Sequence, residues 1–121
     1  MAELTHFDNN GNAHMVDISE KQISFRIAKA ACSVHMSLET LKIISDGSAK
    51  KGDVLSVARI AGIQGAKRTS ELIPLCHPIS LTKVNLDLIL NEKLPGIEII
   101  ATAKTNGPTG VEMEALTAVS I

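Results

Sequence analysis

The stretch from Arg59 to Pro78 constrains the fold more than any other part of the chain. Small and aliphatic residues lead into it at helical spacing, which predicts a helix packed on an apolar neighbour. This predicted stripe consists of Val57, Ala58, Ala61 and Gly65, with Ile60 and Ile63 on its flank. Lys67 and Arg68 suit the last helical turn, because positive charge there interacts favourably with the helix dipole. We therefore expect a helix that ends at Pro74, followed by a tight turn and a strand.

Leu75, Cys76 and His77 lie between two prolines, Pro74 and Pro78. Each proline fixes its own φ and disfavours helical geometry in the preceding residue, so we expect a stiff, extended bend. An imidazole and a thiol on a rigid bend between two elements form a candidate reactive site. The alternative is a buried cysteine and a hydrogen-bonded histidine in an ordinary loop.

The segment before this region predicts a strand and a short helix. Apolar residues alternate from residue 23 to 36 but change phase near Ala30, which suggests a bulge or bend within one long strand. Ser37 is a credible N-cap for a short helix that stops at Asp46 and Gly47. The loop that follows contains two lysines and leads into Asp53, the expected cap of the long helix. It is either a solvated loop or an anion site at a helix N-terminus, and its glycine spacing does not fit a P-loop.

The segment after the bend predicts a hairpin and a last helix. Residues 84–90 and 97–103 alternate and are separated by a short turn, which favours an antiparallel pair. Thr109 and Glu112 have capping-box spacing, so a helix should begin there. Glu112 and Glu114 would diverge by about 200° on a helix. Both can serve one site only if the turn is irregular or the site lies between subunits.

The order strand, helix, helix, strand, strand, helix is a βαββαβ plan without its final strand. The fold class is therefore α+β, with an antiparallel sheet and with its final strand missing from the residues shown. We expect an irregular arm over residues 1–20 and a single α+β domain over residues 21–121, incomplete at its C-terminal end. His6, His14 and Asp17 are scattered along the arm and match no compact set of metal ligands.

Composition excludes several classes of function. The net charge of −1 provides no general attraction to nucleic acid or membranes, and two phenylalanines without tyrosine or tryptophan leave few rings for stacking bases. We see no secretory signal and no apolar stretch long enough to span a bilayer. Two cysteines do not form a disulfide framework. We therefore expect a cytosolic protein with an aliphatic core and reduced thiols.

Several motifs in order then resemble one family, the molybdenum-cofactor biosynthesis protein C family of cyclic pyranopterin monophosphate synthases. They are Lys50-Lys-Gly-Asp-Val-Leu, Ala58-Arg-Ile-Ala-Gly-Ile-Gln, Ala66-Lys-Arg-Thr, Leu72-Ile-Pro-Leu-Cys-His-Pro and Thr109-Gly-Val-Glu-Met-Glu-Ala-Leu-Thr-Ala. The resemblance covers nearly every residue. It implies a ferredoxin-like fold with helices on one face of the sheet, and a cytoplasmic homo-oligomer. That assembly is a hexamer, a trimer of dimers, with the site at a dimer interface.

The resemblance also implies a reaction, an early step of molybdenum cofactor biosynthesis. It is the conversion of cyclised dihydro-GTP (3',8-cyclo-7,8-dihydro-GTP) to cyclic pyranopterin monophosphate, with release of pyrophosphate. The implied partner is this small GTP-derived nucleotide, with no nucleic acid and no membrane. No metal site and no cofactor is implied, although Mg²⁺ could accompany the triphosphate.

By position, the resemblance assigns residues to roles. The catalytic residues it implies are Lys51, His77, Glu112 and Glu114. The substrate-binding residues it implies are Leu75, Cys76, His77, Met113 and Glu114, with Arg26, Lys67 and Arg68 as triphosphate contacts. A histidine beside carboxylates suits the proton transfers of ring opening and closure, and cations suit the charge that develops on phosphate. We interpret Cys76 as a backbone contact rather than a nucleophile.

The chain departs from the family pattern in three places. The family has a catalytic Asp and Lys and the closing strand after the position of Ile121, so we expect the residues shown to be catalytically deficient. Pro108 stands where a lysine is expected, and Gly65 replaces the usual alanine. Two alternatives follow. One is a nucleotide-binding or assembly form of the same fold without the chemistry, and the other is a metal hydrolase that uses His77, Glu112 and Glu114.

Overall fold

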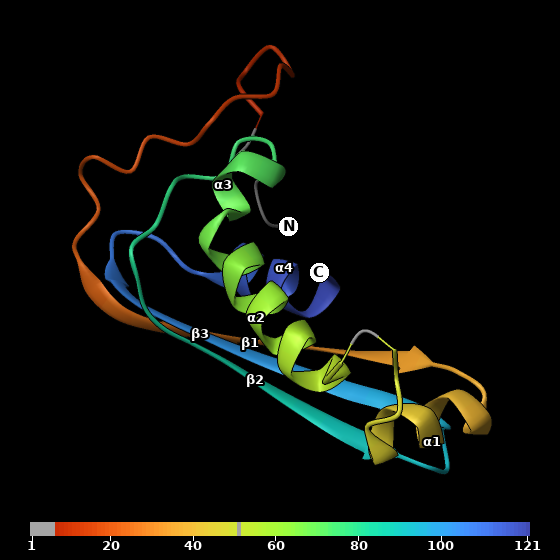
Figure 1. Cartoon of the computed structure of the whole chain (residues 1–121). Helices are drawn as coiled ribbons and strands as arrows, with labels where there is room; N and C mark the ends of the chain where they lie inside the picture. Colours follow the sequence, from red (N-terminus) through yellow and green to blue (C-terminus); the bar gives the residue numbers. More distant parts are fainter. Residues whose placement is uncertain (1–6, 51) are drawn as a thin grey trace.

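The computed structural model describes residues 7–50 and 52–121 and has an α+β fold, as predicted. Figure 1 shows helices α2 and α4 lying over one face of a long antiparallel sheet. The elements in chain order are β1 (Ser24–His35), α1 (Leu38–Asp46), α2 (Val54–Lys67), α3 (Thr69–Leu72), β2 (Leu81–Asn91), β3 (Gly96–Gly107) and α4 (Glu112–Ser120). Within the described residues none of these helices is both long enough and apolar enough to cross a bilayer.

The sheet has three strands in the order β1-β3-β2 within the part of the chain that the structure describes. β2 and β3 form the predicted antiparallel hairpin. β1 pairs with the other side of β3 along its whole length, from Ser24 opposite Gly107 to His35 opposite Gly96. This arrangement matches the βαββαβ plan without its final strand.

The bulge predicted near Ala30 is wrong. The register of β1 against β3 runs without a shift, and Ala30 lies directly opposite Ala101. The apolar residues change phase because they occupy different faces of one regular strand, as the two-residue period of a pleat requires. Cys32 packs with the core, whereas Phe25 and Ile27 are 61% and 50% exposed. The register shift lies in β2 instead, between Leu81 and Lys83.

The core between helices and sheet is aliphatic, as the composition predicts, and its centre is made of small residues. Ala101 and Ala103 of β3 are fully buried under α4, whose Ala115 and Ala118 are also buried. Short side chains on both surfaces let helix and sheet approach closely. Leu86 of β2 fills the space beside them.

α2 buries a different face from the one that its sequence spacing suggests. Gly62, Gly65 and Ala66 are buried, whereas Val57 and Ile60 are 60% and 58% exposed. Small residues are favoured at the buried face because α2 crosses close to both α4 and β2. The predicted stripe is therefore wrong at Val57, and an apolar strip of α2 remains on the surface.

The predicted caps of the first two helices are confirmed. The Ser37 hydroxyl accepts a hydrogen bond from the backbone N–H of Thr40 at 3.1 Å, and Gly47 ends α1 with a φ of 77°. The Asp53 carboxylate accepts from the N–H of Ser56 at 3.2 Å at the start of α2. Local polar chemistry alone places these helix ends.

Candidate active site

A cavity of about 380 Å³ opens between the bend after α3 and the first turn of α4. It brings together all six predicted site residues from these two segments. The lining residues are Ile73, Pro74, Leu75, Cys76, His77, Ile79, Thr109, Gly110, Glu112, Met113 and Glu114. Thr109 and Gly110 were not predicted as site residues, and the glycine-rich segment before α4 was the signal for them.

The bend is tighter than the extended form that two prolines suggested. The backbone N–H of Cys76 donates to the carbonyl of Ile73 at 3.4 Å, and Leu75 has a φ of 64°. A proline at the second position and a left-handed residue at the third are typical of a type II turn. The turn reverses the chain directly before Cys76 and His77, so both face the cavity.

α4 begins two residues later than the capping box predicts, since Val111 rather than Thr109 is its N-cap. Its N-cap is Val111, which makes no side-chain hydrogen bond to the helix and is fully buried in the core. The burial of an aliphatic side chain therefore outweighs a polar cap at this end. Thr109 lines the cavity instead, and the carboxylate of Glu112 lies directly over Gly110, where no Cβ occupies the space.

The position of the helix start also places both glutamates in one cavity. Glu112 is the first residue of α4 and is exposed, so its side chain is free to fold back over the preceding loop. Glu114 lies half a turn further and is only 3% exposed. Because Glu112 stands at the end of the helix, both glutamates can line one cavity within one chain, although they would diverge in the middle of a helix.

The buried end of the cavity pairs a thiol with a carboxyl group. Cys76 Sγ lies 3.7 Å from Glu114 Oε2. Burial, with the nearby Glu114 charge and hydrogen bond, raises the pKa of Cys76 to about 11. Burial also raises the pKa of Glu114, and Glu112 adds to that rise, while the Glu114 backbone N–H and the Cys76 thiol oppose it.

The predicted cationic residues lie outside the cavity. Arg26 donates from Nε to the carbonyl of Gly107 at 3.1 Å and from Nη2 to that of Pro108 at 3.5 Å, so it holds the loop before α4. Lys67 and Arg68 are exposed at the C-terminal end of α2. Lys51 lies outside the described residues.

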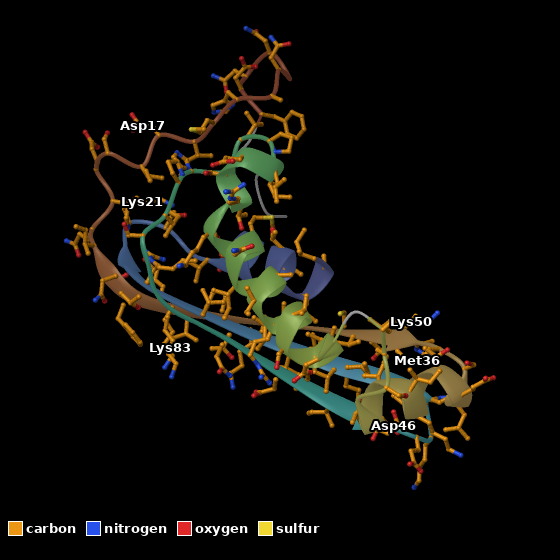
Figure 2. All side chains as sticks on the ribbon, viewed as in Figure 1. Asp17, Lys21, Met36, Asp46, Lys50 and Lys83 are labelled. Carbon is orange, nitrogen blue, oxygen red and sulfur yellow. The ribbon has the colours of Figure 1, made fainter. Side chains whose placement is uncertain are left out.

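The loop before α2 and the cavity lie at opposite ends of that helix. α2 has 14 residues and is therefore about 21 Å long. Figure 2 shows Lys50 near α1, far from the α3 end of α2 from which the bend departs. No lysine or arginine is among the described residues that line the cavity.

The N-terminal arm passes near the bend. Asp8 accepts hydrogen bonds from the backbone N–H groups of Asn10 and Asn12 at 2.9 Å, so residues 8–12 form a turn. Hydrogen bonds from Ser19 lower the pKa of Asp17, and the positive form of His77 lowers it further. Among the described residues, no group of three histidine, cysteine, aspartate or glutamate side chains is placed to hold a metal ion.

Comparison with known proteins agrees with the motifs. The MoaC family matches residues 15–121. A cyclic pyranopterin monophosphate synthase of Cereibacter sphaeroides is 61% identical over the whole chain, which covers 76% of that protein. Enzymes of the same name from Dinoroseobacter shibae and Jannaschia sp. are 61% and 60% identical, with 77% and 74% of their lengths covered. The chain therefore belongs to the MoaC family.

Proposed function

We propose that this chain is a cyclic pyranopterin monophosphate synthase that acts in molybdenum cofactor biosynthesis. It converts 3',8-cyclo-7,8-dihydro-GTP to cyclic pyranopterin monophosphate and releases pyrophosphate. Family membership supports the reaction, since relatives that are 60–61% identical carry this name. The structural observation that best supports this active site is a single cavity lined by His77, Glu112 and Glu114.

The side chains in the cavity suit the proton transfers of this reaction. Opening a purine-derived ring and closing a pterin moves several protons, and positioned acids and bases accelerate such steps. The two glutamates occupy unequal environments, because Glu114 is buried and Glu112 is exposed. Groups whose surroundings separate their pKa values can act as acid and base in one site. We assign the more basic role to Glu114 and the solvent-facing role to Glu112, with His77 between the two segments.

Binding the triphosphate requires cations that the cavity of one chain does not contain among its described lining residues. Two carboxylates alone would repel such a ligand. We propose that Lys51, Lys67, Arg68 and Arg26 bind the phosphates and that Lys51 acts from a second subunit. The position of Lys50 at the far end of α2 supports this arrangement. The site then lies at a dimer interface.

An assembly of subunits is supported by the apolar surface that one chain exposes. Val57 and Ile60 form an exposed strip on α2, and Phe25 and Ile27 lie on the open face of the sheet. Exposed apolar patches are typical of interaction surfaces. We propose a hexamer made of three dimers, working in the cytoplasm without a cofactor, with Mg²⁺ as a companion of the triphosphate.

Turnover of 3',8-cyclo-7,8-dihydro-GTP tests the function, with pyrophosphate release as the measurement. His77→Ala should lose at least about 100-fold in kcat, the usual contribution of a positioned acid or base. His35→Ala is the matched control, because His35 is exposed at the C-terminal end of β1 and does not line the cavity. Unchanged turnover in His77→Ala would contradict the assignment of His77. Nucleotide binding without product in the wild-type protein would favour the catalytically deficient form.

A further inference from the structure

Glu114 has an unusual set of hydrogen-bond partners. A carboxylate that is 3% exposed is costly to bury unless donors satisfy its oxygens. Besides its own backbone N–H, the side-chain donor that reaches it among the described residues is the Cys76 thiol, at 3.7 Å from Oε2. The other titratable groups that line this cavity are His77 from the bend and Glu112 from α4, and the described part of α2, α3 and the strands adds no charged side chain to it.

The thiol also has a second acceptor. Cys76 Sγ lies 3.7 Å from the carbonyl oxygen of His77 as well as 3.7 Å from Glu114 Oε2. One S–H proton serves one of these acceptors at a time. When Glu114 is ionised, the thiol is best directed to the carboxylate. When Glu114 carries a proton, the thiol can turn to the carbonyl.

We propose that Cys76 is a positioning residue for Glu114, whose thiol holds the carboxyl group toward the cavity and follows its protonation by exchanging acceptors. This proposal rests on the proposed function for its catalytic meaning. It assigns the side chain of Cys76 a role beyond the backbone contact expected from the motif.

A thiol suits this role better than a hydroxyl group. An S–H group is a weak donor, so it orients the carboxylate without strongly stabilising the charged form. A serine would make a shorter, stronger bond to the carboxylate and favour ionisation. The thiol thereby leaves the pKa of Glu114 raised by burial, and its own raised pKa of about 11 keeps the thiol protonated at neutral pH.

The contact is tested without enzymatic activity by titrating the thiol. A Cys32→Ser background leaves Cys76 as the one thiol, and a serine can keep the bond that Cys32 makes to the Val119 carbonyl. In this background Glu114→Gln should lower the pKa of Cys76, measured from thiolate absorbance or from alkylation rate against pH. Glu112→Gln is the matched control and should change it less. An unchanged thiol pKa in Glu114→Gln would overturn the proposal whatever the reaction is.

The role is tested by the pH dependence of kcat/KM for pyrophosphate release. One limb of this pH profile should report the titration of Glu114 and should therefore be absent in Glu114→Gln. That limb should lie at lower pH in Cys76→Ser and at higher pH in Cys76→Ala than in the wild type. We expect kcat to fall about 10-fold in Cys76→Ala, with KM changed less than about 2-fold. A purely structural role would lower activity without moving the limb in opposite directions, and coinciding profiles would overturn the proposal. If the wild-type protein turns over no substrate, the proposed function fails, and the thiol titration still decides the contact.

Discussion

At the scale of single residues, the cavity depends on positions where one added group changes the geometry. Gly110 leaves the space that the Glu112 carboxylate occupies. Leu75 holds a left-handed backbone that costs about 1–2 kcal/mol relative to a helical one. Such costs at a cavity indicate that geometry, rather than stability, is favoured there.

Gly110→Ala should disturb Glu112 specifically. A Cβ at this position would overlap the Glu112 carboxylate, which is the far end of a flexible side chain and can move away. We expect kcat to fall at least about 10-fold while the free energy of unfolding changes by less than about 1 kcal/mol. Pyrophosphate release and denaturant unfolding measure the two effects.

A double-mutant cycle identifies the cause of that loss. If alanine at position 110 acts through Glu112, adding Gly110→Ala to Glu112→Gln should cost little further activity. Additive losses would show that Gly110 contributes by another route.

Glu114 should make stability depend on pH. Burial raises the pKa of Glu114 above its usual value of 4.5, so the folded state favours the protonated form. This contribution to stability is fully present below the unfolded-state pKa and is lost as the pH rises through the folded-state pKa. Glu114→Gln carries no charge at any pH, so it should be more stable than wild type at neutral pH. Urea unfolding of both proteins should give converging free energies near about pH 4, and a constant difference would contradict this account.

At the scale of elements, the packing of α2 on α4 and β2 places the bend and the cavity. The contact is close because glycines face the neighbours. A Cβ built on Gly62 would lie 2.5 Å from Leu86 Cδ2 and 2.9 Å from the Ala118 carbonyl oxygen. A Cβ built on Gly65 would lie 2.7 Å from Ile121 Cγ1.

These two glycines should respond differently to alanine. Alanine gains about 1 kcal/mol of helix propensity at either site. At Gly62 it must displace a buried leucine and a backbone carbonyl, so we expect destabilisation of about 1–3 kcal/mol. At Gly65 it displaces the exposed side chain of Ile121, so we expect a neutral or stabilising change. Thermal and denaturant unfolding of Gly62→Ala and Gly65→Ala measure the change in the free energy of unfolding, and each variant is the control for the other because both make the same substitution in the same helix. Equal changes would show that close packing does not decide the effect of alanine in α2.

At the scale of the whole molecule, the two ends of α2 carry complementary chemistry. Carboxylates and the histidine line the cavity at one end, and the lysine-containing loop with Lys50 lies at the other. If the cavity of each subunit faces the lysine-containing loop of its partner, a two-fold dimer contains two complete sites.

Mixed inactive variants should therefore restore activity. After co-refolding His77→Ala with Lys51→Ala, half the dimers are mixed and each contains one intact site, so about a quarter of wild-type activity should return. His77→Ala with Glu114→Gln is the control, since both residues belong to the same cavity and no intact site forms. Failure of the first pair to recover activity, in an assembly shown by light scattering to exchange subunits, would place the whole site in one chain.

Sequence patterns predicted most elements because their signals are local. Ser37, Gly47 and Asp53 set helix ends through hydrogen bonds or a left-handed backbone within a few residues. The alternation in β2 and β3 predicted their hairpin for the same reason. The motifs around His77 and Glu114 predicted the candidate site residues. The structure places the predicted residues of both motifs, 75–77 and 112–114, around one cavity.

Three of the predictions that failed depend on which residues are buried. Helical spacing at Val57 and Ala58 fits two neighbouring faces, and contact with α4 and β2 selects the glycine face. The phase change at Ala30 reflects an apolar outer face of the sheet rather than a bulge. Thr109 and Glu112 had cap spacing, but burial of Val111 moved the helix start.

By itself the sequence determined the α+β class, the order of the three strands and of the main helices, and the family, and it predicted the residues of the candidate site; the short helix α3 was expected as part of one helix ending at Pro74. Backbone propensities, caps and motifs act over a few neighbouring residues, so they can be read without a structure. Only the tertiary structure decided that Cys76 meets Glu114, that Glu112 folds over Gly110 and that Lys50 lies far from the cavity. These relations depend on how close helices and sheet approach, and that distance is set by the packing of residues far apart in the chain.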